Sequence, residues 1–170
     1  MSSPSGHVLL RPWGSEDADF LLASFADDEV RLMTPLIEPI SLDIARRWIL
    51  EHSAKTARPA SPAFLITTQE GLRVGAIGAT NINWRSRQAE FFYWVLAPWR
   101  NQGFASAALA TISSWALEEG LQRLELMIDV QNQASAAVAL RAGYRFERVI
   151  SNYRVLNGRS IDAAAYARLA

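Results

Sequence analysis

The sequence contains no cysteine, only the two histidines His7 and His52, and no excess of either charge, with 17 basic and 17 acidic residues. The absence of cysteine excludes disulfides and thiol chemistry. Two histidines so far apart do not form a metal-ligand pattern, so we expect no metal cofactor. A balanced net charge is not the electrostatic signature of a nucleic-acid-binding protein, so we expect no nucleic-acid partner.

The sequence also lacks a long hydrophobic run, because no apolar stretch reaches the ~18 residues that a membrane-spanning helix needs. Residues 1–6 are small and polar, unlike a signal peptide, and we predict that they form a disordered leader. The remaining residues, 7–170, are of a length that suits one domain, and half of the chain is hydrophobic. These features predict a soluble cytoplasmic protein with one sizeable core and no membrane partner.

The spacing of apolar residues predicts a mixed α/β (α+β) domain with about seven strands and four helices. Ser15 is a plausible N-cap for the first helix and Ser41 for the second, while Pro35 and Pro39 predict a loop between them. Asn157-Gly158 predicts a hairpin turn. The expected strands are 7–12, 63–68, 74–82, 90–96, 124–130, 144–156 and 160–168, and the expected helices are 16–26, one beginning at residue 41, 103–119 and 132–142.

One segment, from Val95 to Ser106, has a pattern that suits binding of an anion. A strand ends, a short loop follows, and a helix begins at Gly103. Amides at a helix N-terminus lack intrahelical partners and carry partial positive charge, and a glycine lets an anion come close to them. Arg100 adds a full charge, so the segment predicts a metal-free pyrophosphate site. Alternatively, Gly103 only starts the helix and Arg100 is a solvated charge.

The same segment resembles the Gcn5-related N-acetyltransferases (GNAT), because Arg100-x-x-Gly103-x-Ala105 matches their Gln/Arg-x-x-Gly-x-Gly/Ala signature. The order of expected elements is also that of the family. The resemblance is greatest to bacterial ribosomal-protein N-terminal (alanine/serine) acetyltransferases. It extends to three further blocks, which are Leu10-Arg11-Pro12-Trp13, Asn132-Gln133-Ala134-Ser135 and the tail from Leu156 to Arg168.

This resemblance implies a single-domain GNAT fold, in which a mostly antiparallel sheet opens between its fourth and fifth strands. It implies acetyl-CoA as the acyl-donor cosubstrate. The coenzyme would be held in this opening and at the loop that precedes the predicted helix 103–119. An amide near Val95 or Leu96 would polarise the thioester carbonyl. The implied coenzyme-binding residues are Trp94, Val95, Leu96, Arg100, Asn101, Gln102, Gly103, Phe104, Ala105, Ser106 and Asn132.

The resemblance also implies two catalytic residues. Ser135 would protonate the departing thiolate, and Glu90 would accept the proton of the attacking amine through a water molecule. Each has a simpler interpretation: Ser135 is a small polar residue in a first helical turn, and Glu90 is an ordinary edge charge. Asn132 has a second role as an N-cap, compatible with coenzyme binding. Tyr144 falls where the family has a core aromatic residue.

The implied activity is transfer of an acetyl group to a primary amine, by direct attack of a protein or peptide N-terminal α-amine on the thioester. Two alternatives remain open: an enzyme acting on a small amine (an amino sugar, antibiotic or amino acid), and a non-catalytic CoA-binding module. Phe92 stands where related sequences usually have glycine, and its large side chain would narrow the acceptor groove or alter a bulge beside it. Trp48 or Trp84 could line that groove and residues 33–39 could cover it. A monomer and a homodimer are both compatible with the sequence.

Overall fold

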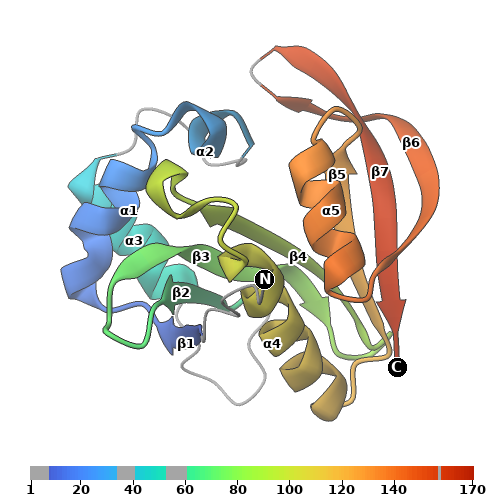
Figure 1. The fold of residues 1–170 in the computed structure, drawn as a ribbon, viewed down its shortest axis with the longest axis horizontal. Coiled ribbons are helices and arrows are strands. Elements are labelled where there is room, and N and C mark those ends of the chain that lie inside the picture. Colours follow the sequence, from blue (N-terminus) through green and yellow to red (C-terminus); the bar gives the residue numbers. More distant parts are fainter. Residues whose placement is uncertain (1–7, 34–40, 53–60, 157) are drawn as a thin grey trace.

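The computed structural model describes residues 8–33, 41–52, 61–156 and 158–170, which form one seven-stranded sheet with helices on both faces (Figure 1). The strand order is β1-β2-β3-β4-β5-β7-β6, and every neighbouring pair is antiparallel except β4 and β5. The strands are β1 (Leu9–Pro12), β2 (Ala63–Thr67), β3 (Arg73–Asn83), β4 (Gln88–Val95), β5 (Arg123–Asp129), β6 (Arg145–Leu156) and β7 (Arg159–Leu169). The expected α/β class and its mostly antiparallel sheet are confirmed.

Four of the five α-helices in the described residues fall into two groups. In Figure 1, α1, α2 and α3 lie beside β1–β3, while α5 lies in front of β5 on the other side of the molecule. The bounds are α1 (Ala18–Ser24), α2 (Asp28–Met33), α3 (Leu42–His52), α4 (Phe104–Glu118) and α5 (Gln133–Arg141), with single 3₁₀ turns η1 (Ser15–Asp17) and η2 (Ala97–Trp99). None of the described helices is long and apolar enough to cross a membrane.

Strand β4 separates the two hydrophobic cores, because its successive side chains point to opposite faces of the sheet. Ala89 and Phe91 are buried in the larger core, which α4 and α5 cover. Trp94 is buried in the smaller core, formed with α1 and α3. Side chains of β4 on the face of Trp94 therefore border the side of the molecule that carries α1–α3.

Two local expectations for the N-terminal part need correction. Ser15 is not an N-cap; it is the first residue of η1, and α1 begins only at Ala18. The Asp17 carboxylate accepts a hydrogen bond from the Gly14 amide at 2.9 Å and so closes the η1 turn, but it makes no side-chain cap bond to α1. The segment before Pro35 contains a fifth helix, α2, which is too short at 6 residues to show an apolar period.

Other local expectations are confirmed. The Ser41 hydroxyl accepts a hydrogen bond from the Ile44 amide at 3.3 Å, so Ser41 caps α3. The glycines at 103 and 143 adjoin α4 and α5, with φ of 87° and 85°. The predicted leader (1–6) and the predicted loop over the acceptor, apart from Met33, lie outside the described residues.

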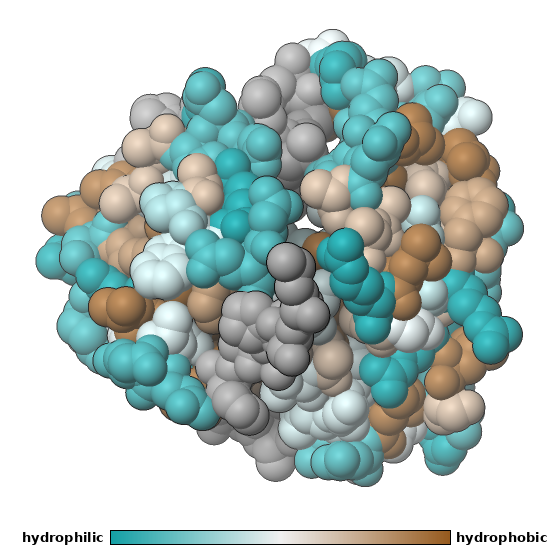
Figure 2. Space-filling view, viewed as in Figure 1, coloured by the Kyte–Doolittle hydropathy of each residue, from teal (hydrophilic) through white to brown (hydrophobic). Residues whose placement is uncertain are grey.

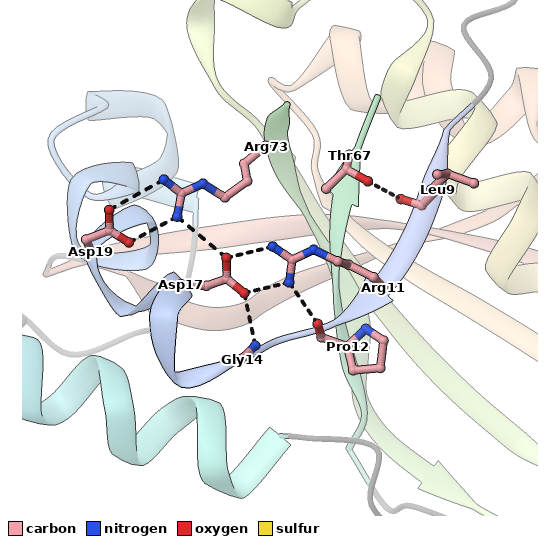
Figure 3. Close-up of polar contacts among 8 residues, drawn as sticks. All are labelled: Leu9, Arg11, Pro12, Gly14, Asp17, Asp19, Thr67 and Arg73. Carbon is pink, nitrogen blue, oxygen red and sulfur yellow. Dashed lines mark hydrogen bonds and ion pairs between the residues drawn. The ribbon is translucent and has the colours of Figure 1, made fainter. Parts of the chain in front are cut away.

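A buried carboxylate fixes β1 and α1 to the sheet (Figure 3). Asp17 has a side chain only 1% exposed, and it accepts hydrogen bonds from both terminal nitrogens of Arg11, at 2.6 and 2.7 Å. Arg73 of β3 lies 3.5 Å from Asp17 and 3.0 Å from Asp19 of α1. Charge-assisted bidentate pairs of this kind are strong and directional. The network therefore fixes four elements, β1, η1, α1 and β3, relative to one another.

Candidate active site

The two parallel strands at the centre of the sheet pair over only three positions and then diverge. The last pair is Glu90 with Glu125, yet β4 continues to Val95 and β5 continues to Asp129. A β-bulge at Thr80 of β3 lies directly opposite Glu90. A bulge bends the strand that carries it and increases its twist, so β3 is bent at the level where the pairing of β4 with β5 ends. The space-filling view shows the surface hollowed between the two halves of the molecule (Figure 2).

The backbone of Val95 faces this opening. The Leu96 amide donates to the Val74 carbonyl of β3 at 3.0 Å. Amides along a strand alternate between its two neighbours, so the Val95 amide points to the opposite side, where β5 has diverged. Of the three residues expected at the strand end, Trp94, Val95 and Leu96, it is Val95 whose N–H group is directed into the opening.

The loop before α4 presents a run of amides at one end of the opening. Asn101 and Gly103 have positive φ, 61° and 87°. A side chain at Gly103 would meet no atom within 4 Å, so the surface beside it is open. Among the described residues, no hydrogen-bond partner is found for the amides of 101–106. Unpartnered amides at the N-terminus of a 15-residue helix suit a phosphate group.

Two side chains hold this loop in shape. The Gln102 amide nitrogen donates to the Pro98 carbonyl at 2.9 Å. The ring of Phe104 is buried and contacts Trp99 edge to face, with 5.8 Å between ring centroids. Because its ring is buried, Phe104 presents mainly its backbone at the loop surface.

Arg100 does not direct its guanidinium toward the amides of the loop. Its Nη2 donates to both carboxylate oxygens of Asp27, at 2.7 and 2.8 Å, and its Nη1 lies 3.1 Å from Glu29. Its Nε donates to the Val95 carbonyl at 3.0 Å. The positive charge expected beside a bound anion is thus paired with two carboxylates in this structure.

The start of α5 lies across the opening from β4. Asn132 accepts a hydrogen bond from the Ser135 amide at 2.9 Å, which confirms its N-cap role. The Tyr93 hydroxyl of β4 donates to the Ser135 carbonyl at 3.2 Å and so connects the diverging strand to α5. Burial raises the pKa of Tyr93 to about 12, although its hydrogen bond to Ser135 acts in the opposite direction. For the half-buried Ser135 hydroxyl, no partner is found among the described residues.

Glu90 lies where the strands separate, and its environment differs from that of an exposed edge charge. Burial raises the pKa of its carboxyl above the usual value, although the Tyr153 hydrogen bond and the charge of Arg154 lower it. The Tyr153 hydroxyl of β6 is 3.3 and 3.4 Å from the two carboxylate oxygens. These contacts are long for hydrogen bonds between oxygens, so they stabilise the ionised form only weakly. The carboxyl is therefore suited to take up a proton.

Glu125, the partner of Glu90 across the strand pair, has a different environment. Arg123 donates to its Oε1 from two nitrogens, at 2.9 and 2.7 Å, and also bonds Glu147. The carboxylate of Glu125 is thus paired with a close cation, whereas no ion pair is found for Glu90 among the described residues, although the charge of Arg154 acts on it. Two carboxyl groups at one register position therefore have different electrostatic environments.

Several aromatic residues named from the sequence belong to the cores. Trp48 is 7% exposed in the smaller core, and Tyr144 is 1% exposed with its hydroxyl 2.8 Å from the Ser113 hydroxyl. Phe92 stacks on Trp94 at 5.9 Å between centroids. Its ring also lies over Gly78, where a side chain would come within 2.9 Å of it. Gly78 therefore provides the space that Phe92 occupies.

The described residues contain no group of His, Cys, Asp and Glu that could hold a metal ion. Sequence reasoning missed three residues of this region: Asp27, Tyr93 and Tyr153. Tyr93 and Tyr153 have no sequence signal of their own, because each contact joins positions at least 42 residues apart. Asp27 likewise lies 73 positions from Arg100, so no local pattern joins the two residues.

Residues 7–145 match the family model for the acetyltransferase (GNAT) domain. The chain is 28% identical over 163 residues to the N-acetyltransferase YoaA of Bacillus subtilis (strain 168), covering 94% of this chain and 92% of that protein. It is 33% identical over 107 residues to the ribosomal-protein-serine acetyltransferase of Escherichia coli (strain K12), covering 62% and 59% of the two chains. RimL, a ribosomal L7/L12 α-N-protein acetyltransferase solved with coenzyme A, has a similar fold, with a TM-score of 0.85, 23% identity and coverage of 99% and 96%.

The diverging strands and the amide-rich loop thus belong to an acyl-transferring enzyme of known architecture. The chain is a member of the GNAT acetyltransferase family.

Proposed function

We propose that this enzyme transfers an acetyl group from acetyl-CoA to the α-amine at the N-terminus of a protein or peptide, in the cytoplasm. The observation that carries the proposal is the divergence of β4 and β5 beyond Glu90 and Glu125, with the unpartnered amides of 101–106 at one end of the opening. The similarity to a ribosomal-protein-serine acetyltransferase supports a protein acceptor.

The coenzyme would be held mainly by backbone groups. The amides of Asn101, Gln102, Gly103, Phe104, Ala105 and Ser106 would receive the pyrophosphate, because they lie at a helix N-terminus beside an open surface. The amide of Val95 would bind the arm that enters the opening, and Asn132 would contact it from the start of α5. Bound there, acetyl-CoA supplies an activated acyl group as a thioester.

Two side chains would move the protons. Glu90 would accept a proton from the attacking amine, and its raised pKa makes the carboxylate a better base than an exposed one. Ser135, in the first turn of α5, would donate a proton from its hydroxyl to the departing sulfur. The Tyr93 hydroxyl would hold that turn in place through the Ser135 carbonyl.

The demand on the base favours an α-amine over a lysine side chain. An α-amine with a pKa of ~7.8 is about one-third neutral at pH ~7.5, so deprotonating it costs under ~1 kcal/mol. A lysine amine with a pKa of ~10.4 would cost about 4 kcal/mol at the same pH. A carboxylate with weak hydrogen bonds meets the first demand more easily than the second.

The test is in two stages. Calorimetry with coenzyme A should show binding to the wild type, and Gly103→Val should weaken it about tenfold or more, because a β-branched residue at a φ of 87° would strain the loop that presents the amides. Release of free thiol from acetyl-CoA would then be measured with a panel of peptides and small amines. The fastest turnover should occur with a peptide that begins with serine or alanine. A small amine as the best acceptor would replace the proposed substrate, and the absence of coenzyme binding would refute the enzyme proposal entirely.

A further inference from the structure

Arg100 and Asp27 come from distant parts of the chain, and their contacts raise the question of what Arg100 does for coenzyme binding. Asp27 precedes α2 and is 73 residues from Arg100 in sequence. Besides the bond to Arg100, its carboxylate accepts the Ala97 amide at 3.1 Å. Ala97 is the first residue of η2, which leads directly into the loop that carries the unpartnered amides.

The same carboxylate caps α2, because it accepts the amides of Glu29 at 3.1 Å and Val30 at 3.5 Å. One side chain thus binds the start of η2, the guanidinium of Arg100 and the first turn of α2. The side chain of Asp27 is 14% exposed, and that of Arg100 is 26% exposed. Burial would raise the pKa of Asp27, but the hydrogen bonds from Arg100 and Ala97 outweigh it and lower that pKa.

The charges around Arg100 do not favour a direct contact with an anion. Asp27 and Glu29 together carry two negative charges against the single positive charge of Arg100. Both carboxylates lie at hydrogen-bond distance from the guanidinium. A pyrophosphate that approached Arg100 would therefore be repelled by two negative charges. The third contact of the guanidinium, from Nε to the Val95 carbonyl, also fixes the end of β4 relative to the loop.

We propose that Asp27 is a positioning residue for the coenzyme loop, and that Arg100 serves coenzyme binding by holding the loop to Asp27 rather than by placing its charge on the pyrophosphate. This inference rests on the proposed coenzyme site. Binding is tighter when the bound shape of a loop is already formed, because less conformational freedom is lost on association. Breaking the Asp27 contacts would let the loop between η2 and α4 take up other shapes and would so weaken coenzyme binding.

The test compares Asp27→Asn with Asp28→Asn by calorimetry with coenzyme A. Both variants remove one negative charge from the same turn, but within the part of the chain that the structure describes, the Asp28 side chain pairs with Arg31 of α2 and not with the coenzyme loop. We expect Asp27→Asn to raise the Kd about tenfold and Asp28→Asn to leave it within about twofold. If the charge of Arg100 acted directly, removing the Asp27 carboxylate would release that charge, and Asp27→Asn would bind as tightly as Asp28→Asn or more tightly. That result would overturn the inference.

Arg100→Lys is the second variant, and it also decides the matter if Asp27→Asn does not fold. Lysine keeps the positive charge but cannot make the paired contacts of a guanidinium, and it leaves the cap of α2 intact. We expect a loss of affinity similar to that of Asp27→Asn, whereas a direct charge would preserve affinity within about twofold. For Asp27→Asn, the KM for acetyl-CoA should rise while kcat at saturation stays within about twofold; a fall in kcat with an unchanged KM would contradict a positioning role. A wild type that does not bind coenzyme A would refute the proposed function instead.

Discussion

Asp17 of η1 and Glu90 of β4 are two carboxylic acids in shielded positions, and their surroundings shift their pKa values in opposite directions. Asp17 accepts short hydrogen bonds from Arg11 and Gly14, and these outweigh burial and lower its pKa. Among the described residues, Glu90 accepts hydrogen bonds only from the Tyr153 hydroxyl, over long distances; burial outweighs these and the charge of Arg154 and raises its pKa. The number and closeness of donors, rather than burial alone, therefore separate a carboxylate that stabilises the fold from one that can exchange a proton.

The largest effect should follow Asp17→Ala, which leaves Arg11 and Arg73 without their shared partner. Removing one partner of a buried ion pair typically costs 3–5 kcal/mol, and we expect about 3 kcal/mol because the Arg11 side chain is 40% exposed. Urea denaturation measures this loss. Asp19→Ala is the control and should cost much less, because Asp19 is exposed. Equal midpoints for the two variants would show that the Asp17 network does not stabilise the fold as described.

The two carboxyl groups should also give opposite pH dependences of stability. The contribution of Asp17 is present above its unfolded pKa of about 3.9 and is lost as pH falls through its lower folded pKa. The raised pKa of Glu90 favours the folded state at low pH, and this advantage declines as pH rises from about 4.3 toward the folded pKa. Denaturation of wild type, Asp17→Asn and Glu90→Gln from pH 3 to 7 measures the free energy of unfolding and tests both expected directions of its change with pH. An Asp17→Asn variant with the pH slope of the wild type below pH 4 would contradict the first.

The contrast extends to two serines. Ser113 is buried with its hydroxyl bonded to Tyr144, whereas the Ser135 hydroxyl has no such partner among the described residues. We expect Ser135→Ala to lower kcat about a hundredfold, with little change in coenzyme affinity, because it removes the proposed proton donor. Ser113→Ala should lower stability and leave kcat nearly unchanged. Steady-state kinetics on both variants make the comparison, and an unchanged kcat in Ser135→Ala would remove Ser135 from the mechanism.

A smaller loss of activity should follow Glu90→Gln. An α-amine is partly neutral at working pH, so losing its base should lower kcat/KM only about tenfold. Glu125→Gln is the matched control at the same register position, and its effect on kcat/KM should be smaller because Arg123 already occupies that carboxylate. The two variants are compared by thiol release with one peptide acceptor. Equal effects would contradict the separate roles given to the two residues.

The smallest effect is a shift in pH dependence for Tyr153→Phe. The Tyr153 hydrogen bond lowers the pKa of Glu90, so its removal should raise that pKa further. Because the base must be ionised, the acidic limb of the kcat/KM profile should move to higher pH, by less than about one unit for so long a contact. The shift should be absent when Glu90→Gln is also present. A shift that persists in the double variant would assign the acidic limb to another group.

The sequence by itself determined the order of the elements, because apolar spacing and helix caps act over a few residues. The caps at Ser41 and Asn132 and the glycine at the start of α4 were all readable in this way. Sequence reasoning did not predict η1 and α2. These short elements are shaped by hydrogen bonds to the Asp17 and Asp27 carboxylates rather than by an apolar period.

Only the tertiary structure decided which groups meet at the site. The sequence motif predicted that Arg100 and Gly103 serve one pyrophosphate site. In the structure, the Arg100 guanidinium pairs with Asp27, 73 positions away. The environment of Glu90 likewise depends on Tyr153, 63 positions away, and on the end of the pairing between β4 and β5. Hydrogen bonds and burial depend on distance in space, and a chain that folds into a seven-stranded sheet places distant segments side by side. A local pattern can therefore name the residues of a site, but the fold sets their charges and partners.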